Sequence, residues 1–212
     1  MVNLTLKNLP PKSCVQITVK GYGEQSIFLF PVDYENYFKL LAKYKIEFGI
    51  KIYGFCLMPD YVHLVLQADD SLDLSRFLKT VNEHYALYFN EKYERRGRLW
   101  NKDIRSLVIR RFPQLVHCLN DIELEPVRAS LSQSPIEYLW SSYLYRILYV
   151  RNEAKSQSYA SVILDPIALV RGVFLPSSHD ISPTLRSISR DIRSRVEKRP
   201  ILKLAASLGI GE

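Results

Sequence analysis

The sequence predicts an α+β protein with the ferredoxin-like split βαβ sandwich, in which helices cover one face of an antiparallel sheet. Short segments with an apolar residue at every second position alternate with longer segments of helical spacing. Their order is strand, helix, strand, strand, helix, strand, and an additional helix follows. The pair Pro59-Asp60 lies between the two middle strands, where a tight turn is required.

The first half of this plan consists of a strand, a helix and a hairpin. Residues 14–20 alternate and are rich in β-branched side chains, which favours a strand. Apolar residues then recur at helical spacing up to Phe48, and we expect Asp33 as the N-cap of this helix and Gly49 as its C-cap. The two hairpin strands are expected at residues 50–58 and 62–67.

The second hairpin strand divides its side chains between the two faces of the sheet, because the period of a strand is two residues. One face receives Val62, Leu64 and Leu66, and the other receives Tyr61, His63 and Val65. Tyr61 and His63 are therefore expected side by side.

The second half begins with a long amphipathic helix at about residues 73–93. A basic turn, Arg95-Arg96-Gly97-Arg98, separates it from an alternating strand at residues 104–110. A third helix is expected at residues 113–125. It should end before Pro126, because the residue that precedes a proline is disfavoured in the α region.

The length of 212 residues allows one sizeable domain and an appendage. We expect a main domain at residues 1–150, a linker or extension at 151–184 and a basic helical tail at 185–212. The net charge of +7 is concentrated in this tail, where residues 185–203 hold seven lysines and arginines against two acidic residues. The tail is therefore expected to attract anions.

Several classes of protein are excluded by what the sequence lacks. It has no apolar run of about 18 residues and no secretory signal, so we expect no membrane span. Its three cysteines, Cys14, Cys56 and Cys118, form no C-x-x-C pair, so neither a zinc knuckle nor a disulfide framework is predicted. Buried thiols in a reducing compartment fit best, and a cytoplasmic location is expected.

Five segments together resemble the REP-associated tyrosine transposases and their insertion-sequence relatives, the HUH endonucleases. The likeness spans roughly residues 14–146, and the segments agree in order and spacing. The segments are GYGEQSIF from Gly21, YGFCLMPDYVHLVL from Tyr53, LSRFLKTVNEHYALYFNEKYERRGRLW from Leu74, IELEPVRASL from Ile122 and WSSY from Trp140.

The resemblance implies a definite chemistry. In this family two histidines flank one hydrophobic residue on a strand and bind a divalent metal, and a helical tyrosine attacks the scissile phosphate of single-stranded DNA. A polar residue four positions after that tyrosine completes the metal site. In this sequence Tyr61 stands at the first histidine position, Asp121 at the nucleophile position and Glu125 at the polar position.

A modified metal site is one interpretation of these positions. His63 with Glu125 and Asp121 would supply one imidazole and two carboxylates, a donor set suited to Mg²⁺ or Mn²⁺. The alternative is a half-buried strand histidine with a hydrogen-bond partner, and then no cofactor is certain. For Tyr61 the alternatives are a nucleophile and a side chain that fills the volume of the absent imidazole.

Candidate DNA contacts cluster on the basic turn and at the end of the third helix, since interleaved arginine and aromatic residues stack bases and contact phosphates. The alternative for the turn is a solvated basic loop, and for Arg128 a local ion pair. The candidate residues are Arg95, Arg96, Arg98, Trp100 and Arg128.

These observations predict a transposase-like protein that binds single-stranded or hairpin DNA through the open sheet face and the basic turn, with the cleavage chemistry lost. Two alternatives stay open: an active metal-dependent transposase or nickase with altered catalytic residues, and a protein-interaction scaffold derived from a transposase. The sequence leaves the oligomeric state open between monomer and homodimer.

Overall fold

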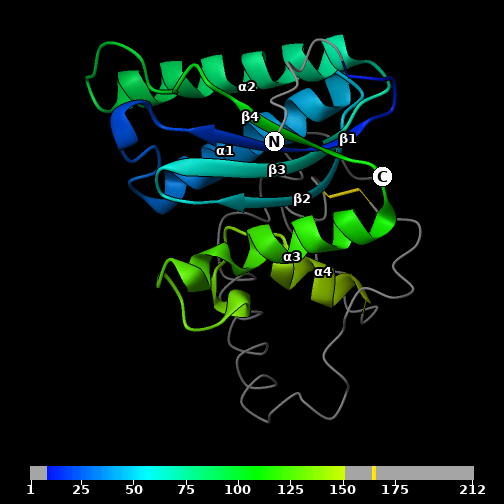
Figure 1. Cartoon of the computed structure of the whole chain (residues 1–212). Coiled ribbons are helices and arrows are strands. Elements are labelled where there is room, and N and C mark those ends of the chain that lie inside the picture. The colour runs from blue at the N-terminus through cyan, green and yellow to red at the C-terminus, as the bar shows by residue number, and fades with distance from the viewer. Residues whose placement is uncertain (1–8, 151–163, 166–212) are drawn as a thin grey trace, which may run out of the picture.

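The computed structural model of the protein describes residues 9–150 and 164–165 (Figure 1). Apart from residues 164 and 165, the expected linker at 151–184 and the expected basic tail at 185–212 lie outside the described residues. The proposed domain boundaries therefore stay predictions.

One four-stranded antiparallel sheet organises the fold. Its strands are β1 (Cys14–Lys20), β2 (Lys51–Leu57), β3 (Tyr61–Gln67) and β4 (Arg105–Ile109). They lie in the order β2-β3-β1-β4. The helix α1 (Pro31–Glu47) connects β1 to β2, and β3 lies between these two strands. This arrangement confirms the split βαβ prediction.

Helices lie on both faces of the sheet (Figure 1). α1 packs against α2 (Ser71–Lys92) on one face, while α3 (Phe112–Arg128) crosses the other. The expectation of helices on one face is right for α1 and α2 and wrong for α3. The reason is that the second face also carries apolar side chains, among them Cys56 and Val65, which the apolar side of α3 buries. No helix in the described part of the chain is long and apolar enough to cross a membrane.

The main core lies between the sheet and the pair α1 and α2. Val62, Leu64 and Leu66 are fully buried there, as their alternation predicts. Aromatic rings fill the layer, and Tyr37 of α1 meets Tyr85 of α2 edge to face with ring centroids 5.1 Å apart. This packing fixes the sheet, whose opposite face carries Tyr61 and His63 beside the apolar residues under α3.

The start of α1 differs from the expectation for Asp33. The N-cap is Phe30, and Asp33 lies in the first turn of the helix. Its fully buried carboxylate accepts hydrogen bonds from the backbone amides of Leu29 and Phe30, both at 2.9 Å. It also accepts hydrogen bonds from three side chains at the end of α2: Tyr88, Lys92 and Tyr93. Asp33 therefore ties the start of α1 to the end of α2, immediately before the basic turn.

The ends of two helices also differ from the sequence predictions. α3 continues through Pro126 to Arg128, so the predicted end before the proline is wrong. A proline near the C-terminus of a helix removes one hydrogen bond, and burial of the Pro126 ring in the core offsets that loss. In α1 the C-cap is Phe48, and Gly49 follows it with a φ of 62°.

α3 is held close to the sheet by a glycine and by a buried ion pair. A Cβ added to Gly54 of β2 would lie 2.3 Å from the Leu119 side chain, so the helix packs where no side chain intervenes. On α3, the fully buried Glu123 pairs with Arg146 of α4 (Tyr143–Val150) and accepts a hydrogen bond from Ser142. These contacts fix the position of α3 and hence of the side chains that it presents to β3.

Candidate functional site

The candidate site lies where the C-terminal half of α3 passes over β3. Tyr61 begins β3, and its hydroxyl donates a hydrogen bond of 3.0 Å to Oε1 of Glu125 on α3. The strand alternation turns Tyr61 toward α3, and the close packing of α3 brings Glu125 within reach. Tyr61 and Glu125, which the sequence analysis expected at the positions of a metal site, are therefore bonded to each other.

Arg128 extends this contact along α3 to Asp121. Its guanidinium lies 3.7 Å from Oε2 of Glu125 and 3.1 Å from Oδ1 of Asp121. Asp121 and Glu125 are four residues apart, so they share one side of the helix. Tyr61, Glu125, Arg128 and Asp121 form a continuous series of hydrogen bonds and ion pairs, which we call the β3–α3 brace.

His63 lies beside the brace on the same face of the sheet. Its Nδ1 is 2.9 Å from the Thr18 hydroxyl of β1, directly opposite in the strand register, and its ring meets Tyr61 edge to face at 5.1 Å. Burial lowers the pKa of His63 to about 4, with Lys20 lowering it further and Glu125 opposing both. The imidazole is therefore neutral at physiological pH.

Tyr61 is held as a protonated phenol. Burial raises its pKa above the ordinary value of 10, and the hydrogen bond to Glu125 raises it further. The ammonium of Lys20 lies 5.6 Å from the centre of its ring. A phenol that burial keeps protonated is a weak nucleophile, which favours the volume-filling interpretation of Tyr61.

The donor set does not fit the divalent metal that the family resemblance implies. Glu125 uses one carboxylate oxygen for Tyr61 and places the other against Arg128. His63 supplies one imidazole, and its Nδ1 is already bonded to Thr18. Among residues 9–150 and 164–165, no group of three or more His, Cys, Asp or Glu side chains is arranged to hold a metal ion.

The structure separates the expected DNA contacts into two sets. Arg95 and Trp100 have structural roles: Arg95 donates to Gln25 at 2.5 Å, and the buried Trp100 indole donates to the Asn82 carbonyl at 2.8 Å. Arg128 belongs to the brace. Arg96 and Arg98 are exposed on the turn and are accessible to a ligand.

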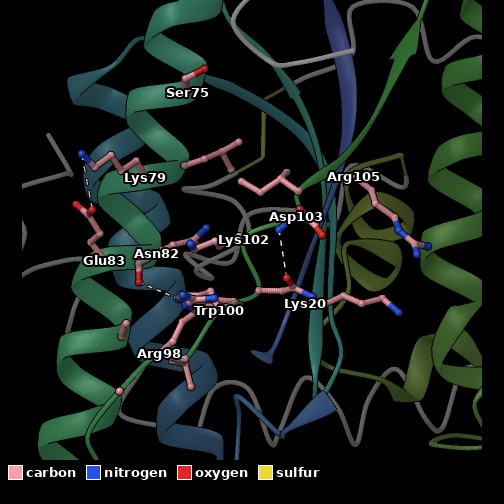
Figure 2. Close-up of a pocket in the computed structure, with 16 residues that line it drawn as sticks. Lys20, Ser75, Lys79, Asn82, Glu83, Arg98, Trp100, Lys102, Asp103 and Arg105 are labelled. Carbon is pink, nitrogen blue, oxygen red and sulfur yellow. Dashed lines mark hydrogen bonds and ion pairs between the residues drawn. The ribbon is translucent and has the colours of Figure 1, made fainter. Parts of the chain in front are cut away.

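A groove beside α2 brings in basic residues that the sequence analysis did not select. Its volume is about 1120 Å³, and it runs between α2 and residues 97–105. Figure 2 shows Lys20 and Arg105 extending from the strands away from α2. Arg105 is opposite Thr18 in the strand register, and Thr18 is opposite His63. Lys20 ends β1 and Arg105 begins the adjacent strand β4. The strand alternation could have indicated the face on which each lies, but only the pairing of the two strands brings them near each other. Lys102 is exposed on the segment between them.

Comparison with known proteins identifies the domain. The family model described as "Transposase IS200 like" matches residues 24–106. This part of the chain is similar to the IS200-like transposases. The match includes Tyr61 and His63 on β3, while Asp121 and Glu125 on α3 lie beyond it. None of the curated proteins matches the sequence.

Solved structures support the IS200-like fold. A REP-associated tyrosine transposase bound to a REP hairpin superposes with a TM-score of 0.59 at 16% sequence identity, covering 84% of this chain and 96% of that chain. A proposed transposase from Deinococcus radiodurans gives a TM-score of 0.40 at 18% identity, covering 69% of this chain and 94% of that chain. At these identities the first likeness establishes the fold alone, and the second adds no argument.

We expect the protein to lose stability because of His63 as the pH falls from 6.5 toward 4. The folded pKa of about 4 lies below the ordinary value of 6.5, so the unfolded chain binds the proton first. The contribution of His63 is present above pH 6.5 and is lost as the pH falls through 4. In urea unfolding across this range, the free energy of unfolding of the unchanged protein minus that of His63→Gln should fall as the pH falls from 6.5 to 4.

Glu123 titrates in the same range with the opposite sign, because burial raises its pKa to about 7. It is present in both proteins, so the difference between their two curves isolates His63. Two curves with the same pH dependence would contradict a histidine held neutral by burial.

Proposed function

We propose that this protein is a transposase-like DNA-binding protein that recognises single-stranded or hairpin DNA and does not cut it. The observation that carries the proposal is the β3–α3 brace. In the brace, Tyr61 and Glu125 are bonded to each other at the positions where the family resemblance implies metal ligands. Arg128 pairs with Glu125 and with Asp121, which is at the position where the resemblance implies the nucleophile.

The residues of the brace are poorly suited to strand cleavage. Asp121 stands at the nucleophile position, and its carboxylate is paired with Arg128, which withdraws charge from the attacking oxygen. Attack by a carboxylate would give an acyl phosphate, which hydrolyses far more readily than a phosphotyrosine and so does not store the energy of the broken bond. Tyr61, the phenol of the brace, keeps its proton and donates a hydrogen bond to Glu125.

Exposed basic residues support DNA binding close to the brace. Lys20 and Arg105 project from adjacent strands toward the sheet face that carries His63, and Arg98 and Lys102 continue this charge along residues 97–105. Cations spaced along a surface bind the phosphates of a strand and release its counterions. The superposed transposase was solved with a REP hairpin, which supports hairpin DNA as the ligand to test first.

Strand cleavage can be tested directly with a labelled hairpin carrying a single-stranded tail. We expect neither nicks nor a covalent protein–DNA adduct on a denaturing gel in the presence of Mg²⁺ or Mn²⁺, because the brace supplies neither a free nucleophile nor a metal site. Asp121→Ala is the matched control. An adduct that forms with the unchanged protein and disappears with Asp121→Ala would contradict the proposal and establish the alternative of an active enzyme with altered residues.

DNA binding should depend on salt through the basic residues near the brace. We expect Lys102→Ala and Arg105→Ala each to weaken single-strand binding and to reduce the slope of log K against log salt by about 0.7. Fluorescence anisotropy over a range of salt concentrations measures this slope.

Lys51→Ala is the control for these two variants, because Lys51 is an exposed residue of β2, the strand at the opposite edge of the sheet. It should leave the slope unchanged. Binding that shows no salt dependence in the unchanged protein would rule out the proposal and favour the alternative of a protein-interaction scaffold.

A further inference from the structure

Tyr22 and Arg98 form an exposed stacked pair at the end of the groove beside α2. The guanidinium carbon of Arg98 lies 5.1 Å from the centre of the Tyr22 ring. Tyr22 is 52% exposed, and Arg98 is exposed as well. Neither side chain is used by the brace or by the main core, so the function proposed above does not account for this pair.

The backbone that carries both residues is held by hydrogen bonds. The backbone amide of Tyr22 donates to the Leu99 carbonyl at 2.8 Å, and Gly21 pairs with Trp100 in the manner of a short strand. Gln25 donates a further hydrogen bond of 2.9 Å to the Leu99 carbonyl. Leu99 and Trp100, the two residues that follow the exposed arginine, are buried and anchor the segment on that side. The pair is therefore held in place before any ligand binds.

The charge around the pair favours an anionic ligand. Arg98 and Lys102 contribute positive charge to the groove, and Arg105 and Lys20 contribute at its far side. Of the acidic residues in the lining, Glu83 lies 3.8 Å from Lys79 and is balanced by it, which leaves Asp103 as a single opposing charge. Figure 2 shows Arg98 and Trp100 together at one end of the groove, with Lys102 between them and the strands.

We propose that Tyr22 and Arg98 form a stacking site for an unpaired base of single-stranded DNA whose phosphates follow the groove beside α2. This inference rests on the proposed DNA-binding function and adds that the protein recognises an unpaired base. Aromatic rings and guanidinium planes both offer a flat surface to a base. A base within a duplex has both faces covered by its neighbours, so the site selects unpaired DNA.

The test compares Tyr22→Ala and Tyr22→Phe for binding to an oligothymidine and to a blunt duplex of equal length. Tyr22→Ala should weaken binding of the oligothymidine by about 10-fold and leave duplex binding unchanged. Tyr22→Phe keeps the ring and should bind as the unchanged protein does. Arg98→Lys keeps the charge but loses the plane, and it should weaken oligothymidine binding with an unchanged salt slope.

Two controls separate stacking from a change in folding or charge. Phe112→Ala removes an exposed aromatic ring from the start of α3 and should have no effect on either ligand. An oligonucleotide of abasic sites offers phosphates without bases, and on it the difference between the unchanged protein and Tyr22→Ala should vanish.

The inference is overturned if Tyr22→Ala weakens binding of the abasic and the normal strand equally, or if it weakens neither. These results would leave the DNA-binding function intact, because the unchanged protein would still bind. Failure of the unchanged protein to bind any DNA in a salt-dependent way would instead overturn the proposed function and this inference together.

Discussion

The hydrogen bond between Tyr61 and Glu125 joins β3 to α3, the two elements that carry the candidate site. The neighbouring contacts of the site lie on either side of this hydrogen bond. The close approach of α3 at Gly54 and the buried Glu123–Arg146 pair bring the helix to the sheet, and the hydrogen bond fixes the remaining polar side chains between them. Arg128 then connects Glu125 to Asp121, and the ring of Tyr61 packs against His63. In the family that the sequence resembles, a metal ion would make the same connection between strand and helix.

The side chains of the β3–α3 brace satisfy one another. The Tyr61 hydroxyl supplies a donor, Glu125 supplies the matching acceptor, and Asp121 supplies a second acceptor for Arg128. Loss of one partner of the Tyr61–Glu125 hydrogen bond would leave the other without its partner beside the core, which is costly. The Asp121–Arg128 pair is exposed and adds little stability. The DNA-binding surface that we propose depends on other residues, chiefly basic ones on β1, β4 and residues 97–105, so it does not require the cleavage chemistry.

Much of the fold follows from patterns that are local in the sequence. Alternation placed Tyr61 and His63 on one face and buried Val62, Leu64 and Leu66 on the other, because the period of a strand is independent of its surroundings. The predictions that failed depend on contacts between distant segments. Pro126 continues its helix because its ring is buried, and Trp100 is a core residue because Asn82 accepts from its indole. The Asp33 carboxylate accepts hydrogen bonds from three side chains at the end of α2, which a rule for local helix capping does not include. Lys20 and Arg105 approach each other only through the pairing of β1 with β4.

The central claim is that a hydrogen bond between two side chains, and no metal ion, connects β3 to α3. A double-mutant cycle with Tyr61→Phe and Glu125→Ala, measured as the free energy of unfolding, tests it most directly. The account predicts a coupling energy on the order of 1 kcal/mol, the same in excess EDTA as in Mg²⁺ or Mn²⁺. A coupling energy near zero, or a protein that Mn²⁺ stabilises and EDTA destabilises, would contradict it, because an ion that binds only the folded state must raise its stability.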